Sequence, residues 1–216
     1  MNKYKSMAIL QDSPSSGSGL LAIFCDLLPE DQIDFHPWLT EDMFPARLNI
    51  GFKSCASFKL IEGDGSEFVT LYEVPSVGYL YDKPYQQLRD NRLPRDASFH
   101  KKFIKPNRYT LSWVGPEKSI NQHGFAEFIN INLFDIQDKY NDLFNSFYIT
   151  RYLPSVANNN ELTSVRRYLS LEGAHKNFIL EESADKKILS NSVLSLNELF
   201  SKNKINSIYK RIIQSI

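Results

Sequence analysis

The sequence predicts an α+β fold in which two β-α-β-β-α-β units follow one another along the chain. Three observations support this prediction. Strand-like and helix-like patterns occur in the same order in both halves, a helical segment with a proline close to its end appears twice, and matching residues recur at a spacing of 109 or 110 positions. A repeat of this kind means that each half needs the other to bury its apolar faces.

The composition is that of a folded protein rather than a disordered chain. Of the 216 residues 42% are hydrophobic, and 15 Phe and 11 Tyr supply bulk for a core. Lys and Arg together number 25, as do Asp and Glu, and no basic run occurs, which argues against nucleic acid as a partner. No apolar stretch reaches the roughly 18 residues needed to cross a membrane. Cys25 and Cys55 form no CxxC pair, which suits reduced thiols in a cytoplasmic protein.

Residues 1–17 end in a Ser/Gly/Pro tract and are predicted to form a flexible N-terminal segment. The first unit then spans residues 18–115. Its expected elements are a strand at 19–28, a helix at 29–47, a hairpin of strands at 52–63 and 67–74, a helix at 76–91 and a strand at 103–115. The first strand is a continuous apolar run, typical of a buried strand. The first helix carries Phe35, Trp38 and Leu39 on one face, a stripe that would pack on a sheet.

A polar linker at 116–123 leads to the second unit, which spans residues 124–216. Its expected elements are a strand at 126–133, a helix at 134–153, a hairpin of strands at 162–173 and 176–183, a helix at 185–202 and a strand at 204–216. Residues of the two halves match in kind. The matches are Phe35 with Phe144, Trp38 with Phe147 and Pro45 with Pro154 at a spacing of 109, and Glu62-Gly63 with Glu172-Gly173 at a spacing of 110.

The order of elements in each unit is the ferredoxin-like arrangement, with both helices on one face of a four-stranded sheet. The other face is bare, although the strands are apolar on both faces for much of their length. A second copy of the same sheet is the simplest cover for it. We therefore expect the tandem ferredoxin-like repeats to pack sheet to sheet as an intramolecular pseudo-dimer, an α/β barrel with its helices outside.

The chain resembles the dimeric α/β-barrel (ferredoxin-like) superfamily, and in particular its uncharacterised two-repeat members. Their first helix reads F-x-x-W-Y-x-x-E-H-x-P-x-R-L, and Phe35, Trp38, Pro45, Arg47 and Leu48 match it. The family strand L-Y-E-L corresponds to residues 71–74, and later pieces are echoed at 83–85 and 99–102. The resemblance covers residues 19–216. It implies the barrel fold and a range of activities, because relatives include cofactor-free monooxygenases, polyketide cyclases, isomerases and haem enzymes.

One departure from the family pattern concerns the Glu-His pair of that helix. The first repeat has Asp42-Met43 in its place and the second has Arg151-Tyr152, so neither copy keeps the histidine. Methionine cannot exchange a proton, and an unperturbed tyrosine is a poor base at neutral pH. We therefore expect the helix to occur twice because the barrel needs it in both halves. Its polar residues differ between the two copies, so they do not indicate one shared catalytic role.

His100, in the segment DASFHKKF before the last strand of the first unit, is the candidate acid or base. Imidazole titrates near neutral pH, and loops at strand ends commonly present catalytic groups. Tyr72 on a hairpin strand and Asp42 on the first helix are the candidates for orienting a substrate. Each has a structural alternative: a surface histidine in a basic loop, a core tyrosine, and an Asp42–Arg47 surface pair.

The candidate substrate contacts surround these three residues. They are His36, Trp38, Met43, Tyr81 and Tyr85. The concentration of tyrosines on the hairpin and the following helix is typical of an aromatic-walled pocket with a few hydroxyl groups, the usual form of a small-molecule site. The same rings could instead be core and rim aromatics, and His36 could face solvent.

Neither a metal site nor a cofactor is predicted. The sequence has no HxH, HxxxH or Cys/His cluster, and no GxGxxG, GxxxxGK[ST] or GxSxG motif. Haem is the one cofactor that the resemblance suggests, because relatives include haem enzymes. Its axial ligand would have to be one of the four histidines, His36, His100, His123 or His175. The sequence pattern places none of them in a binding pocket.

The sequence thus leads to a cofactor-independent enzyme, a cyclase, isomerase, lyase or cofactor-free monooxygenase in biosynthesis. It would act on an apolar, aromatic or polyketide-like metabolite in a cleft of the N-terminal repeat, with His100 as acid or base. The alternative is a non-catalytic ligand-binding or scaffold protein with the same fold. The expected partner is a small molecule, with no membrane and no nucleic acid, and the chain is expected to be a monomer with an internal pseudo-dimer or a homodimer.

Overall fold

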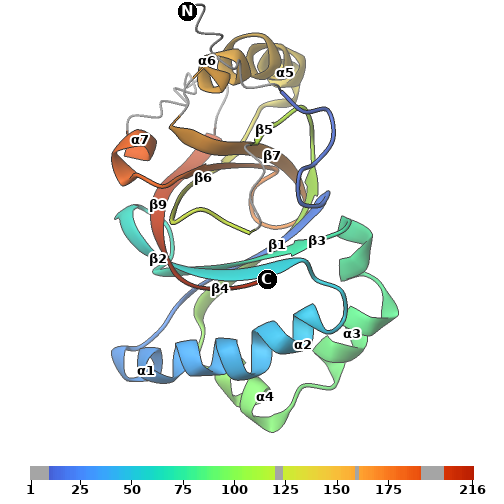
Figure 1. The fold of residues 1–216 in the computed structure, drawn as a ribbon, viewed down its shortest axis with the longest axis vertical. Helices are drawn as coiled ribbons and strands as arrows, with labels where there is room; N and C mark the ends of the chain where they lie inside the picture. The colour runs from blue at the N-terminus through green and yellow to red at the C-terminus, as the bar shows by residue number, and fades with distance from the viewer. Residues whose placement is uncertain (1–9, 120–123, 159–160, 191–201) are drawn as a thin grey trace, which may run out of the picture.

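The computed structural model describes residues 10–119, 124–158, 161–190 and 202–216. Its centre is a closed antiparallel barrel (Figure 1). The strands are β1 (Gly19–Asp26), β2 (Ser54–Gly63), β3 (Phe68–Val74), β4 (Ile104–Trp113), β5 (Lys118–Ser119), β6 (Phe128–Asp135), β7 (Leu162–Glu172), β8 (Asn177–Ser183) and β9 (Lys202–Ser215). Eight of them follow the order β4-β1-β3-β2-β9-β6-β8-β7, and pairing of β7 with β4 closes the ring.

The strand order is the same in both halves. It is β4-β1-β3-β2 in the first half and β9-β6-β8-β7 in the second. The sequence predicted sheets packed face to face, but their edges are also hydrogen-bonded, β2 to β9 and β4 to β7. Register shifts occur in both of these pairings, and such irregularities bend strands. The two sheets therefore curve into one closed ring of eight strands, with the short β5 paired to β7 beside it.

The Glu-Gly matches of the repeat lie at these two seams. Gly63 ends β2 and Gly173 follows β7, and both have positive φ, 106° and 143°. A Cβ atom on Gly173 would overlap the Tyr109 ring of β4, and one on Gly63 would overlap the backbone of Asn206 on β9. Only glycine combines this backbone conformation with so close an approach, which explains why both halves carry it.

The interior of the barrel is one apolar core that both halves build. The first half contributes residues such as Leu20, Phe58, Leu71 and Tyr109, and the second half contributes Ile131, Tyr168, Phe178 and Tyr209. All are less than 2% exposed. The apolar faces of the two sheets, which the predicted helices do not cover, are thus buried against each other.

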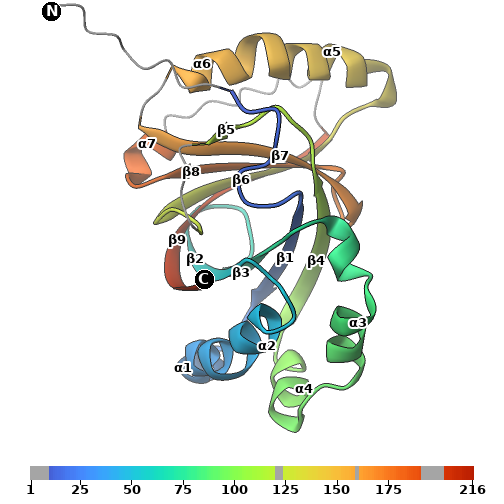
Figure 2. The same ribbon diagram turned by 45° about the vertical axis from the view of Figure 1, so that its right-hand side comes forward.

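The helices lie outside the barrel on two opposite sides (Figures 1 and 2). On the first-half side they are α1 (Pro29–Trp38), the π-helical η1 (Leu39–Met43), α2 (Phe44–Leu48), the short η2 (Val77–Leu80), α3 (Lys83–Asp90) and α4 (Pro94–His100). On the second-half side they are η3 (Asp138–Tyr140), α5 (Asn141–Phe147), the π-helical η4 (Tyr148–Tyr152), α6 (Leu153–Ala157) and α7 (Lys186–Ser190). Among the described residues, none of these helices is long and apolar enough to cross a membrane.

The repeated proline has the same structural consequence in each half. A π-helical turn ends two residues before Pro45 and again two residues before Pro154. In both turns the residue that follows donates its N–H five positions back along the chain. Proline has no N–H and its ring collides with the carbonyl four residues earlier, so the wider turn relieves that conflict without ending the helix.

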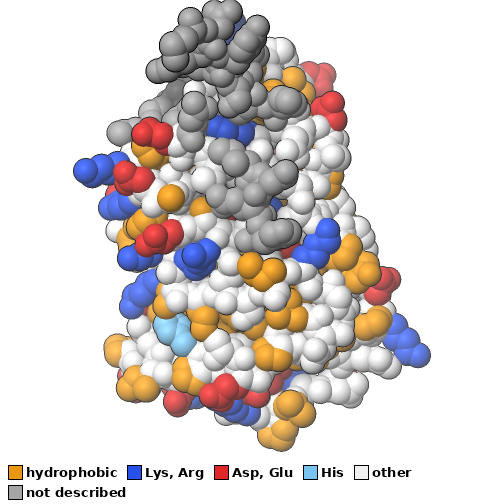
Figure 3. Space-filling view, in the orientation of Figure 1, with side chains coloured by type: hydrophobic (Ala, Val, Ile, Leu, Met, Phe, Trp, Pro, Cys, Tyr) orange, Lys and Arg blue, Asp and Glu red, His pale blue; other side chains and the backbone are white. Residues whose placement is uncertain are grey.

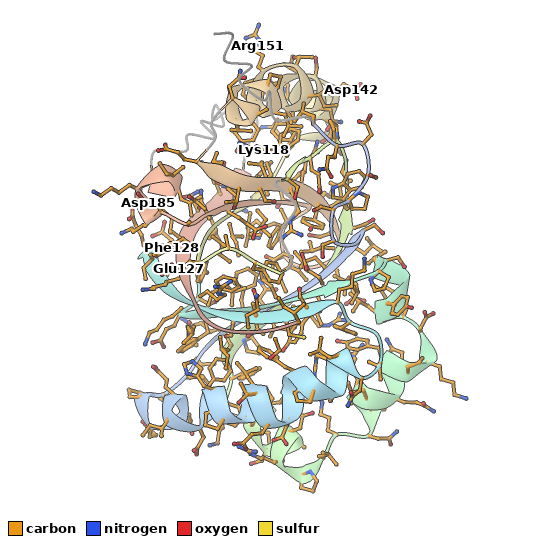
Figure 4. The ribbon with its side chains drawn as sticks, viewed as in Figure 1. Lys118, Glu127, Phe128, Asp142, Arg151 and Asp185 are labelled. Carbon is orange, nitrogen blue, oxygen red and sulfur yellow. The ribbon has the colours of Figure 1, made fainter. Side chains whose placement is uncertain are left out.

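Several predicted elements differ from the structure. The helix expected at 76–91 is broken into η2 and α3, and α4 was not predicted at all. The linker at 116–123 contains strand β5, where Lys118 is fully buried and donates to the Val156 carbonyl of α6 at 3.0 Å (Figure 4). The helix expected at 185–202 is described only as α7, because residues 191–201 lie outside the described part.

The segment before the barrel makes contacts that the sequence did not predict. Residues 1–17 were expected to be flexible, and residues 1–9 lie outside the described part. Gln11 exchanges two backbone hydrogen bonds with Glu117, and the Ser15 N–H donates to the Glu117 carboxylate at 2.8 Å. The Ser16 hydroxyl donates to Glu73 at 2.6 Å. Two buried carboxylates therefore hold this polar stretch against the barrel.

Candidate functional site

A cavity of about 290 Å³ lies in the first half, between its helices and the outer face of the barrel. Strands β1, β3 and β4 form its floor, and α1, η1, α2, α3 and α4 form its walls. Much of its surface is apolar or aromatic, from Leu21, Ile23, Trp38, Leu39, Met43, Tyr72, Tyr85 and Phe103. A concave, mainly apolar space with a few polar groups is the usual form of a small-molecule site.

An aromatic stack fixes the wall that carries His100. The rings of Trp38 and Phe99 are parallel, with an interplanar angle of 8° and centroids 4.5 Å apart. The His100 ring meets the Trp38 ring edge-on at 5.4 Å and lies 5.2 Å from the Phe103 ring. These contacts hold α4 against α1, so the imidazole is positioned by packing as well as by hydrogen bonds.

Asp96 orients His100 from one helical turn away. The imidazole Nδ1 lies 2.9 Å from the Asp96 carboxylate Oδ1 and 2.9 Å from the Asp96 carbonyl oxygen. Burial raises the pKa of Asp96, but the nearby His100, Arg92 and Arg47 outweigh this and hold the pKa below its usual 3.8. The carboxylate is therefore charged at neutral pH and lies beside Nδ1, which is hydrogen-bonded to the Asp96 carbonyl oxygen.

The other ring nitrogen of His100 faces Arg92, whose Nη1 is within hydrogen-bond distance of Nε2. A guanidinium only donates, so Nε2 accepts in this arrangement and the imidazole is neutral. Arg92 also forms an ion pair with Asp96 at 3.5 Å. A carboxylate, an imidazole and a guanidinium thus meet at the cavity wall.

Four arginines line the cavity: Arg47, Arg89, Arg92 and Arg108. Arg92 is paired with Asp96, and Arg108 forms an ion pair with Glu172 at the edge of the second half. Arg47, on α2, is 6% exposed, and its guanidinium carbon lies 5.0 Å from the centre of the Tyr72 ring. The lining contains no Asp or Glu among the described residues. The cavity therefore combines apolar walls with positive charge.

Tyr72 and Cys25, which also line the cavity, are held neutral. Burial raises the pKa of Tyr72 well above its usual value, although Arg47 beside the ring lowers it in part. Burial, with Asp26 and Glu67 nearby, raises the pKa of the Cys25 thiol to about 12. A thiol that stays protonated at neutral pH is a poor nucleophile. Tyr72 can donate a hydrogen bond to a ligand, whereas Cys25 serves as part of the apolar floor.

The structure brings five of the eight sequence-predicted site residues to this cavity, namely Tyr72, His100, Trp38, Met43 and Tyr85. The other three lie elsewhere. Asp42 pairs with Arg95 at 2.9 Å and borders a smaller neighbouring space. The Tyr81 hydroxyl is hydrogen-bonded to Thr110 at 2.9 Å, and its ring is 45% exposed. His36 does not line the cavity, and its Nε2 is buried without a hydrogen-bond partner.

Two interpretations of the sequence need correction in the same region. His100 is the last residue of helix α4 and not part of a loop. Arg47 does not pair with Asp42 at the surface, because it is buried against Tyr72. The sequence reasoning also missed Asp96, although the i,i+4 spacing of Asp96 and His100 was visible and would have become informative once a helix was placed there.

The described histidines do not fit an axial haem ligand in this cavity. His100 is the one that lines it, and both of its ring nitrogens already face partners, Asp96 and Arg92. His175 lies on the other side of the barrel wall, with Nδ1 2.8 Å from the Tyr109 hydroxyl. His123 is outside the described residues. In the described part, no group of three His, Cys, Asp or Glu side chains is arranged to hold a metal ion.

The equivalent positions in the second half carry larger side chains. At a spacing of 109, Leu39 and Met43 correspond to Tyr148 and Tyr152, which are both at least 96% buried. The Tyr152 hydroxyl donates to Glu181, which occupies the position of Tyr72. Larger side chains and a buried hydrogen bond thus stand at the positions that border the cavity in the first half, so the two halves differ at this place.

The barrel is a known fold. An anthrone oxidase-like protein matches with a TM-score of 0.63 over 94% of this chain and 95% of its own, at 10% identity. A candidate monooxygenase from Lactobacillus acidophilus NCFM matches with 0.59 over 92% and 96%, at 11% identity. A variant of chlorite dismutase from Candidatus Nitrospira defluvii matches with 0.53 over 90% and 92%, at 7% identity. These identities are low, so the likeness shows a common α+β barrel fold alone.

Comparison by sequence adds nothing to this. No protein-family model matches the chain, and no curated protein matches it either. The functional interpretation therefore depends on the cavity and its side chains.

Proposed function

We propose that the protein is a small-molecule enzyme of the dimeric α/β-barrel superfamily, built from tandem ferredoxin-like repeats at residues 18–115 and 124–216 with a linker at 116–123. The identical strand order of the two halves supports the duplication. The barrel closes within one chain, so a second copy is not needed to complete it, which supports a monomer with an internal pseudo-dimer.

The proposed substrate is an apolar, aromatic or polyketide-like metabolite bound in the first-half cavity. The reaction begins with proton transfer between the substrate and Nε2 of His100, after Arg92 moves from that nitrogen to the negative charge that develops. Asp96 holds the proton on Nδ1 and stabilises the imidazolium that forms. Tyr72 donates a hydrogen bond to a substrate oxygen. The single observation that carries the proposal is the Asp96–His100 pair, 2.9 Å apart, in the wall of an aromatic cavity.

The proposed reaction class is a cofactor-independent monooxygenation, cyclisation, isomerisation or elimination. Proton removal is the first step that these reactions share, and the cavity supplies the His100 imidazole as the base and a desolvated site for this step. The likeness in fold to an anthrone oxidase-like protein and to a candidate monooxygenase favours oxygenation among the four.

The test uses anthrone and a panel of aromatic polyketide-like phenols, with chelator-treated protein and no added cofactor. Oxygen uptake and product mass are followed for the wild type, for His100→Ala and for the control His36→Ala, a histidine that does not line the cavity. We expect the His100 variant to lose turnover by about 10²-fold or more, and the control to retain it. Unchanged turnover in His100→Ala would remove the assignment.

One observation favours a second candidate function, ligand binding without turnover. Arg92 already occupies the hydrogen-bonding direction of Nε2 on which a base would depend. If the wild type binds panel members, as measured by quenching of Trp fluorescence, but converts none of them, this alternative replaces the enzyme.

A further inference from the structure

The side chain of Arg47 is buried at the cavity without an acidic partner. Its guanidinium donates from Nη1 to the Met43 carbonyl at 3.2 Å and to the Met43 sulfur at 3.3 Å. Nε is buried and has no hydrogen-bond partner. Among the described residues no carboxylate lies within ion-pair distance of the group, and Asp96, which borders the same small neighbouring space, interacts with its charge from farther away. A buried charge that is neither paired nor fully hydrogen-bonded costs free energy. An anion bound beside the Arg47 guanidinium would therefore stabilise it.

The rest of the cavity lining increases this positive charge. Arg89 at the end of α3 also lines the cavity and makes no ion pair with the described residues. Arg108 pairs with Glu172 through Nη1, but its Nη2 is buried without a partner. Arg92 is the arginine whose charge Asp96 balances directly. The lining thus carries two guanidinium groups without an ion-pair partner among the described residues, those of Arg47 and Arg89. It contains no carboxylate, because Asp96, whose charge interacts with Arg47, lies outside it.

We propose that the ligand of this cavity is an aromatic carboxylate, whose carboxylate group binds to Arg47 and whose ring lies on the apolar floor. The inference rests on the proposed function and names its substrate class. The planar guanidinium presents paired N–H donors that match the two oxygens of a carboxylate. The Tyr72 ring behind Arg47 holds the guanidinium in place, so little conformational freedom is lost when the ligand binds.

Arg47 and Arg89 have different roles in this arrangement. Arg47 is 6% exposed and reaches the ligand from within the apolar wall, where an ion pair is little screened by solvent. Arg89 is exposed at the rim, so it attracts the anion from solution and contributes less to the bound state. Truncation of Arg47 should therefore cost more affinity than truncation of Arg89.

The test compares 2-naphthoate with its neutral isostere 2-naphthamide by isothermal titration calorimetry at pH 7. The variants are Arg47→Met, which keeps the packing volume against Tyr72, Arg47→Lys, which keeps the charge without the planar fork, and the control Arg151→Met. Arg151 is exposed on the helices of the second half and points away from the barrel (Figure 4). Thermal melting of each variant checks that it is folded.

We expect the wild type and Arg151→Met to bind the carboxylate about tenfold or more tightly than the amide, as a charge-assisted pair requires. Arg47→Met should remove this preference and Arg47→Lys should reduce it. Equal affinity for acid and amide in the wild type would overturn the inference, and this comparison does not depend on the folding of any variant. A preference that persists in folded Arg47→Met would overturn it as well.

The outcomes separate this inference from the proposed function. If both compounds bind equally and His100→Ala still abolishes turnover, only the carboxylate assignment fails. If neither compound binds, the carboxylate assignment fails too, and the proposed function then depends on the turnover measurements alone. If the acid is preferred through Arg47 but His100→Ala leaves turnover unchanged, the carboxylate site remains and the catalytic assignment is lost.

Discussion

Glu73 and Glu182, which lie 109 positions apart (182 − 73) on β3 and β8, both accept hydrogen bonds from the same buried guanidinium. Arg166 on β7 donates to Glu73 at 2.5 Å and to Glu182 at 2.6 Å, and all three side chains are at most 4% exposed. The two carboxylates are equivalent positions of the two halves, but only the second half supplies the arginine. Ala56 stands at the equivalent position of β2, opposite Leu71 as Arg166 is opposite Leu180.

Arg166→Met should destabilise the fold by about 3–5 kcal/mol, because it leaves two buried carboxylates without a counter-charge. Chemical denaturation at pH 7 measures the free energy of unfolding, and Arg151→Met is the matched control with an exposed arginine. The triple variant that also carries Glu73→Gln and Glu182→Gln should recover part of the loss. A loss below about 1 kcal/mol in Arg166→Met would show that the triad does not hold the halves together.

Stability should also fall in acid through Glu73. Burial raises the pKa of Glu73, but Arg166 and the hydroxyl groups of Ser16 and Ser54 outweigh this and lower it from 4.5. A carboxyl group whose pKa is lower in the folded state stabilises the protein above its unfolded pKa, and this contribution is lost as the pH falls through the folded value. The free energy of unfolding should therefore decrease below about pH 4.5.

Glu73→Gln provides the comparison for this pH dependence. The variant should be less stable than the wild type at pH 7, and the difference between the two proteins should shrink as the pH falls below 4.5. Denaturant unfolding at pH 3 to 7 measures both curves. Parallel curves over this range would mean that Glu73 does not titrate differently in the folded and unfolded states.

The strands and the repeated helix were predictable because their signals are local. Continuous or alternating apolar runs mark β1, β3 and β6. The apolar stripe that contains Phe35 and Trp38 marks the helix that packs on the sheet. Gly63 and Gly173 were visible in the sequence as matching residues of the two halves, but the need for glycine at these two positions was not. That reason is contact across the seams, which joins residues far apart in the sequence.

The candidate site was predicted only in part, because it too depends on contacts between residues that lie far apart in the sequence. Tyr72 and His100 stood out by residue type, whereas Arg47 was interpreted as a surface partner of Asp42. The burial of an arginine depends on which helices pack together, and α4, which closes the wall, is short and begins at a proline in a polar stretch. Asp42 lies five residues before Arg47, yet α4 supplies Arg95, which binds Asp42 instead. Spacing alone does not reveal such a competitor.

The difference between the two halves predicts how to close the cavity. Met43→Tyr places in the first half the side chain that Tyr152 provides in the second. The new ring should occupy the open volume and weaken ligand binding at least tenfold, while the free energy of unfolding changes by less than about 3 kcal/mol. Calorimetry with 2-naphthoate and a denaturation curve measure the two quantities. Undiminished binding would place the ligand outside this cavity.

Asp96→Asn should lower turnover by on the order of 10²-fold while the protein stays folded, because an amide in place of the carboxylate no longer stabilises an imidazolium. Asp96 would act through His100, so the two effects should not add: the double variant Asp96→Asn/His100→Ala should be no slower than His100→Ala. The measurement is turnover of the best panel substrate against pH for each variant. Additive losses in the double variant would instead assign Asp96 a structural role that does not depend on the imidazole.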